Sequence, residues 1–148
     1  MKCIETPMEP GSNIVPPKDC EEVLDILNQN KYQSGVGTLM YLLKNSRPDI
    51  NNSVIELSKY MVRSSQEKMN ILYRVMKYFL DTKDKGLFLK PKFENENKFV
   101  LLGFCDSDWG SNKYDRKIVS CWSIYFCNCL INWGSRTQSF VDSSSSVA

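Results

Sequence analysis

At 148 residues the chain is long enough for one domain with a substantial core, or for two smaller units. Its 42% hydrophobic and 24% charged residues argue against wholesale disorder, and no stretch approaches the roughly 20 apolar residues of a membrane span. The net charge is only +2, but residues 1–31 carry −3 and residues 44–92 carry +6. The middle third is therefore either a surface for a polyanion or a helix face that lysine keeps soluble.

Six cysteines and no histidine limit the possible chemistry. Four of the cysteines fall in or between predicted strands, and no secretory signal precedes them. We therefore expect reduced thiols and an intracellular protein, cytoplasmic or nuclear. The lack of histidine disfavours a structural zinc site and excludes triads and dyads that use histidine as the base.

The N-terminal part of the chain predicts a linker followed by helices. Residues 1–18 are rich in proline and indicate an extended linker. Residues 19–28 predict a short acidic helix. Residues 33–44, which have apolar residues at helical spacing, predict a second helix. Gly35 and Gly37 lie inside the second helix, where each costs roughly 1 kcal/mol relative to alanine. Close packing against another element is the expected reason for both glycines.

Two further helices complete a helical connection segment over residues 19–85. Pro48 suits a first-turn position, and an apolar stripe with spacings of four, three and four residues runs from Ile50 to Met61. Residues 66–81 carry another apolar stripe at helical spacing. We therefore expect three to four helices in all, which bury one another.

Four cations lie off these stripes: Lys59, Arg63, Arg74 and Lys77. In a nucleic-acid-binding protein such side chains neutralise phosphates without reading the base sequence. They are our candidate contacts to a nucleic acid. No membrane partner is expected.

Residues 86–148 predict a sheet that ends in a flexible, serine-rich C-terminus. After a short strand at 87–89, three apolar runs at 99–105, 118–126 and 130–133 indicate antiparallel strands. The whole chain is thus predicted to be an α+β protein, with helices first and strands second.

Two acids, Asp106 and Asp108, follow the first of these three strands. Side chains alternate along a strand, so both acids would leave the same face if the backbone stays extended. Two neighbouring carboxylates repel each other unless a cation offsets their charge, and Mg²⁺ prefers oxygen ligands of this kind. The alternative is a solvated turn that ends the strand.

Several short motifs lie in order along nearly the whole chain. They are Thr6–Glu9, Tyr32–Tyr41, Ser46–Ile50, Cys105–Trp109, Asp115–Lys117, Ser120, Ile131–Trp133 and Ser135–Gln138. Together they resemble copia-type LTR-retrotransposon Pol polyproteins. The motifs in the second half are similar to the start of the family's ribonuclease H domain, and those in the first half to the segment that joins reverse transcriptase to it. The resemblance implies that the nucleic-acid partner is an RNA–DNA hybrid.

The resemblance implies that Asp106 is the first metal-binding carboxylate of a ribonuclease H site, with Asp108 as a second candidate. Enzymes of this kind cut the RNA strand of a hybrid with two Mg²⁺ ions held by several acids. Here the family's next catalytic glutamate falls at Val147. We therefore expect an incomplete ribonuclease H-like sheet that binds Mg²⁺ weakly, has no functional metal and performs no hydrolysis.

Three hypotheses for function remain open at this point. The chain is a fragment of a copia-type Pol, a co-opted module that binds nucleic acid or protein, or a non-functional reading frame. In the truncated sheet, the strand Phe99–Cys105 would expose an edge and an apolar face, which favours self-association.

Overall fold

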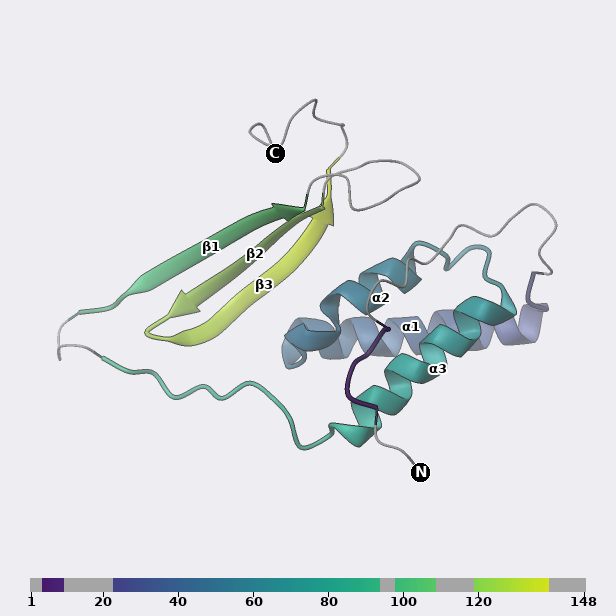
Figure 1. Cartoon of the computed structure of the whole chain (residues 1–148), viewed down its shortest axis with the longest axis horizontal. Helices are drawn as coiled ribbons and strands as arrows, with labels where there is room; N and C mark the ends of the chain where they lie inside the picture. Colours follow the sequence, from purple (N-terminus) through teal and green to yellow (C-terminus); the bar gives the residue numbers. More distant parts are fainter. Residues whose placement is uncertain (1–3, 10–22, 94–97, 109–118, 139–148) are drawn as a thin grey trace. The chain divides into compact units, whose positions relative to one another are not determined.

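The computed structural model describes residues 4–9, 23–93, 98–108 and 119–138, and it divides the chain into two compact units, residues 1–86 and 87–148 (Figure 1). Three helices are followed by a three-stranded antiparallel sheet, which confirms the predicted α+β class. The serine-rich C-terminus and most of the predicted linker lie outside the described residues. Within the described part we find no helix whose length and hydropathy would let it traverse a bilayer.

The first unit contains α1 (Ile26–Asn45), the 3-10 turn η1 (Pro48–Ile50), α2 (Asn51–Ser58) and α3 (Gln66–Asp81). The limits of α3 and the first-turn position of Pro48 are as predicted.

The division of α1 into two helices, 19–28 and 33–44, was wrong. Asp25 has an extended backbone, and its side chain accepts a hydrogen bond from the backbone N–H of Asn28 at 2.7 Å. Asp25 therefore caps the N-terminus of α1. No residue of the following 20 breaks the helix, so α1 is continuous.

The helices bury one another, as predicted. Tyr32, Val36, Ile50 and Leu57 are fully buried, and the hydroxyl of Tyr32 donates a hydrogen bond to the backbone carbonyl of Leu57 at 2.8 Å. The core also contains Leu39, Leu43, Val54, Met69, Leu72, Val75 and Tyr78. The apolar stripes of α1, α2 and α3 thus form a single core. The position of each stripe determines which residues of the helix face the solvent.

The two glycines of α1 differ in their surroundings. A Cβ atom on Gly35 would lie 2.7 Å from Cε of Met76 and 2.9 Å from Cδ2 of Leu72, so α3 packs directly on this position. A Cβ atom on Gly37 would meet nothing within 4 Å. Close packing within the chain therefore explains Gly35, whereas that prediction was wrong for Gly37, which faces open space.

We expect opposite effects when each glycine is replaced by alanine. Gly37→Ala should raise the free energy of unfolding by about 1 kcal/mol, because it improves helix propensity without a clash. Gly35→Ala should lower it by about 1 kcal/mol, because displacing Met76 and Leu72 costs more than the helix gains. Urea unfolding followed by circular dichroism measures both values, and shifts of the same sign would contradict this account.

A buried arginine joins η1 to the end of α3. Nε and Nη2 of Arg47 donate hydrogen bonds to the two carboxylate oxygens of Asp49 at 2.8 and 2.7 Å. Arg47 also donates to the side-chain and backbone oxygens of Thr82, at 2.7 and 3.2 Å. Its guanidinium lies 5.6 and 5.0 Å from the ring centroids of Tyr78 and Phe79. These contacts anchor the turn after α1 to the C-terminal end of α3.

The second unit is a sheet of β1 (Leu101–Asp108), β2 (Val119–Phe126) and β3 (Cys129–Thr137) in the order β1-β2-β3, antiparallel throughout (Figure 1). A two-residue turn, Cys127 and Asn128, joins β2 to β3. Both turn residues have positive φ, 46° and 68°, as a tight hairpin turn requires.

Two details of the strand predictions need correction. Residues 87–89 were expected to form a strand, but they adopt no regular secondary structure. The last strand extends to Thr137, beyond the predicted end at residue 133. Since β1 and β3 are the outer strands of the described sheet, self-association through an edge stays a prediction that sedimentation at several protein concentrations can test.

Candidate functional site

The first candidate site lies on β1, which continues through both acids instead of ending at Cys105. Asp106 pairs with Cys121 of β2, and Asp108 pairs with Val119 as the last residue of the strand. The extended backbone that the sequence argument required is therefore present, while the side chain of Asp108 lies outside the described residues. Asp106 is exposed, and its Oδ1 accepts a hydrogen bond from the backbone N–H of Ser107 at 2.9 Å.

The neighbours of Asp106 on the sheet are poor partners for magnesium. Cys121 lies opposite Asp106, and Ser135 of β3 lies opposite Cys121. Magnesium prefers carboxylate and other hard oxygen ligands, and a thiol is a soft one. Among the described side chains, no group of three or more acids or cysteines comes together to hold a metal ion. The absence of a functional metal at Asp106 stays a prediction.

The second candidate site comprises the four predicted nucleic-acid contacts, which lie at the end of α2, between α2 and α3, and on α3. Lys59 is the C-cap residue of α2, and its Nζ forms an ion pair with Glu56. Arg63 is exposed in the segment between α2 and α3, with no ion-pair partner among the described residues. Only Arg63 of these two therefore presents a charge that no described acid offsets.

Arg74 and Lys77 lie one turn apart on α3, and both are paired with acids. Nη1 of Arg74 lies 3.2 Å from the carboxylate of Glu9, and Nζ of Lys77 lies 2.6 Å from that of Asp81. Both cations line a pocket of about 600 Å³ between residues 4–9 and α3. The other residues that line it are Ile4, Met8, Glu9, Glu67, Asn70, Ile71 and Tyr73.

A further candidate surface, which the sequence argument did not single out, is the side of α1 opposite its core stripe. We call it the α1 outer face; its residues are Lys31, Ser34, Gly37, Thr38, Tyr41 and Lys44, all of them exposed. Tyr41 is 70% exposed, which is unusual for a large aromatic side chain. The helix contains no acidic residue. The α1 outer face therefore combines two lysines, for which no ion pair with a described residue is observed, with hydroxyls, an aromatic ring and a glycine.

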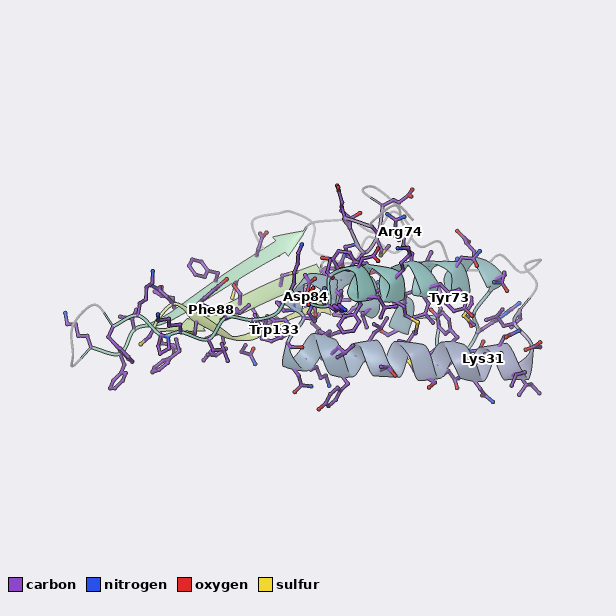
Figure 2. All side chains as sticks on the ribbon, turned by 90° about the horizontal axis from the view of Figure 1, so that it is seen from below. Lys31, Tyr73, Arg74, Asp84, Phe88 and Trp133 are labelled. Atoms are coloured by element: carbon purple, nitrogen blue, oxygen red, sulfur yellow. The ribbon has the colours of Figure 1, made fainter. Side chains whose placement is uncertain are left out.

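This surface could have been found from the sequence by one signal. Lys31, Gly37, Tyr41 and Lys44 recur on one side of the predicted helix, in a segment of the chain without acids. The core stripe of the same helix gives a stronger pattern, which predicts the helix but does not indicate a function for its opposite side. Figure 2 shows that Lys31 belongs to α1 and Arg74 to α3. The α1 outer face and the pair Arg74 and Lys77 therefore lie on different helices.

Comparison with known proteins identifies the origin of the chain. No protein-family model and no solved structure matches it. It is 31% identical over 147 residues to the retrovirus-related Pol polyprotein from transposon RE1 of Arabidopsis thaliana, and 34% identical over 118 residues to that from transposon RE2. The chain belongs to the copia-type retrotransposon Pol family.

The matches cover 99% and 80% of this Pol segment but only 9% and 8% of the two polyproteins. A shorter relative is the secreted RxLR effector protein 161 of Plasmopara viticola. It is 30% identical over 114 residues, which are 77% of this chain and 78% of that protein.

The Pol motifs fall on defined elements of the structure. Tyr32–Tyr41 lies entirely within α1, and Ser46–Ile50 contains the buried Arg47 and the turn η1. Cys105–Trp109 covers the end of β1, while Asp115–Lys117 lies outside the described residues. The Pol motifs thus include Ser34, Gly37, Thr38 and Tyr41 of the α1 outer face, the buried Arg47 and the acids of β1, whereas Lys31 and Lys44 lie outside them.

Proposed function

We propose that this chain is the part of a copia-type Pol that connects reverse transcriptase to ribonuclease H and begins the latter domain, and that it binds an RNA–DNA hybrid without cutting it. The observation that carries the proposal is the α1 outer face. A basic, acid-free helix surface with exposed hydroxyls and a tyrosine is typical of contacts to a nucleic-acid backbone.

Five of the six residues of the α1 outer face have a role in such a contact. Lys31 and Lys44 lie at the two margins of the face and would neutralise phosphates on either side. The hydroxyl of Ser34 would donate a hydrogen bond to a phosphate or a sugar. Gly37 has open space instead of a side chain, so a sugar-phosphate backbone can approach the helix closely. Tyr41 would pack on a sugar or a base.

The absence of cleavage is the second half of the proposal. It is supported by the position of Asp106, which is exposed between a serine and, on the neighbouring strand, a cysteine. One or two carboxylates do not supply the oxygen ligands that two Mg²⁺ ions need in place of their water. Valine at position 147, where the family pattern has glutamate, supports the same view.

Two measurements on the full chain test the proposal. Fluorescence anisotropy with a labelled hybrid of about 16 base pairs should show binding that weakens as salt is raised. Incubation of the hybrid with Mg²⁺ or Mn²⁺ should release no RNA fragments, and Asp106→Asn should not change either result. Metal-dependent cleavage that disappears in Asp106→Asn would overturn the catalytic half of the proposal and leave the binding half intact.

A second candidate function is a stand-alone binding module without chemistry. It is favoured by the match to a secreted effector protein, in which the matched segment makes up 78% of the protein. If the module binds protein instead of nucleic acid, the hybrid will show no salt-dependent binding.

An intracellular location remains part of the proposal for this Pol segment. Cys105 is an exposed free thiol, and Cys127 and Cys129 are buried free thiols. Exposed free thiols are typical of a reducing compartment.

A further inference from the structure

A short N-terminal segment covers one side of α3. Residues 4–9, which we call the strap, contact α3 through two polar links and two apolar side chains. The backbone N–H of Ile4 donates a hydrogen bond to Oδ2 of Asp81 at 3.0 Å, and the carboxylate of Glu9 lies 3.2 Å from Nη1 of Arg74. Ile4 and Met8 are half-buried against the core. The strap therefore ties the start of the unit to a helix that begins more than fifty residues later.

We propose that the side of α3 beneath the strap is a second phosphate-binding surface, which the strap keeps closed by placing Glu9 where a phosphate oxygen would bind Arg74. The inference rests on the proposed function, because the partner that opens the surface is the same RNA–DNA hybrid. It adds a second contact, on a different helix from the α1 outer face, and a device that controls this contact.

The chemistry of Arg74 supports an exchange of ligands. A guanidinium binds carboxylate and phosphate oxygens with the same fork of N–H donors, and it binds best when two donors are used. Here Glu9 takes only one of them. Nε of Arg74 is buried, and no described residue accepts its hydrogen. The pair with Glu9 therefore leaves the fork half satisfied, and a backbone phosphate, which has two non-bridging oxygens, can accept hydrogen bonds from two donors of the fork.

The packing of the strap supports its displacement. The inner side of α3 is tightly packed, with Met69, Leu72 and Val75 at most 2% exposed. Between the strap and the other side of the helix there remains a pocket of about 600 Å³. The carboxylate-bearing side chain of Glu9 is 72% exposed. Contacts with a gap of this size, and an ion pair with so much water around it, hold a segment weakly.

The strap controls Arg74 and not Lys77. When the strap leaves, Arg74 loses the acid that neutralises it. Lys77 keeps its partner, because Asp81 belongs to α3 itself and lies 2.6 Å from Nζ of Lys77. Opening the strap therefore adds one positive charge to the surface that nucleic acid can reach. This distinguishes the two cations, which are equivalent in the sequence.

The test compares two strap acids that differ in one respect. Glu9→Gln removes the partner of Arg74, whereas Glu5→Gln removes the same charge from an exposed residue of the strap for which no ion pair with a described residue is observed. Hybrid affinity is measured by anisotropy for the full-length chain, for both variants, and for each of these with Arg74→Ala added. Circular dichroism confirms that the variants are folded.

We expect Glu9→Gln to raise affinity by about two- to five-fold, the range for one exposed ion pair, and Glu5→Gln to change it less. The slope of log affinity against log salt should steepen by about 1 in Glu9→Gln only. Arg74→Ala should lower affinity in both backgrounds, and more in the Glu9→Gln background, because in the parent chain the gain from the phosphate is offset by the loss of the pair with Glu9. Amide exchange of residues 4–9 should become faster when the hybrid is added to the parent chain.

Equal effects of Glu9→Gln and Glu5→Gln would overturn the inference, because net charge would then explain both. So would strap amides that exchange more slowly in the presence of hybrid, or a Glu9→Gln variant that does not bind at all. If the parent chain fails to bind but Glu9→Gln binds through Arg74, the strap inference stands and the role of the α1 outer face is wrong. The two proposals therefore fail separately.

Discussion

Replacing Asp49 with alanine is expected to lower the free energy of unfolding of the helical unit by about 3 kcal/mol, the lower end of the range for a broken buried ion pair. The side chain of Arg47 is only 3% exposed, so it would be left inside the protein without a counter-charge. Tyr78 would also lose the carboxylate that accepts its hydroxyl hydrogen bond at 2.9 Å. Asp49 itself is 35% exposed, and for this reason we place the loss at the lower end.

The matched control is Glu56→Ala, which also removes one acid from one ion pair of the same unit. Its partner Lys59 is 32% exposed, so water can solvate the lysine when the acid is gone. Such exposed pairs contribute about 0–1 kcal/mol. Urea unfolding at pH 7 gives both values, and losses of equal size would show that Arg47 is not held as a buried charge.

The same variant should change the response of stability to acid. Burial by itself would raise the pKa of Asp49, but the hydrogen bonds from Arg47 and Tyr78 outweigh burial and hold the pKa below its ordinary value. A carboxyl group with a lowered pKa in the folded state stabilises the protein above its unfolded pKa. That stabilisation is lost as the pH falls through the folded value. The difference in stability between the parent chain and Asp49→Ala should therefore shrink below about pH 4.

Helix α3 shows what apolar periodicity can predict in this chain. Its stripe from Met69 to Leu80 and the polar residues before it fixed both limits of the helix, and tertiary contacts did not alter them. The start of α1 was missed because acids at 19–25 suit a helix N-terminus as well as the segment before it. The side chain of Asp25 decides between these, and its hydrogen bond to Asn28 is visible only in the structure.

The polar contacts between residues far apart in the sequence could not be predicted in the same way. Arg47 reaches Thr82 across 35 residues, and Arg74 reaches Glu9 across 65. Nothing in the local pattern indicates such partners, because charge runs in the sequence do not say which acid faces which base. The two glycines of α1 were indistinguishable for a related reason. Only the position of α3 shows that Gly35 is covered and Gly37 is open.

The sequence likewise predicted some features of the candidate site and not others. The motif around Asp106 identified a strand that ends in acids, and the structure confirms the strand and extends it. Three of the four predicted phosphate contacts are paired with acids. Lys59 and Lys77 pair with acids three and four residues away in the sequence, whereas the pairing of Arg74 with Glu9 could not be assigned from the sequence. The α1 outer face has no acids of its own, so its lysines are a better basis for a prediction about binding.

Reversing the charge of both lysines on the α1 outer face, in Lys31→Glu with Lys44→Glu, should weaken binding of the RNA–DNA hybrid by about 10- to 100-fold. Each lysine is exposed, and α1 offers no acid that would compensate it. If both neutralise phosphates, the slope of log affinity against log salt should also become shallower by about 2. Anisotropy titrations over a range of salt concentrations measure both quantities.

The control carries the same change in net charge at the positions that sequence alone favoured. Lys59→Glu with Lys77→Glu alters two lysines that already form ion pairs with Glu56 and Asp81. Its effect on affinity should be several-fold smaller than that of the Lys31 and Lys44 pair, because paired lysines contribute less to the potential at the surface. Equal losses in the two double variants would mean that the hybrid responds to net charge alone. A larger loss in the Lys59 and Lys77 pair would move the binding surface from α1 to the residues that the sequence first indicated.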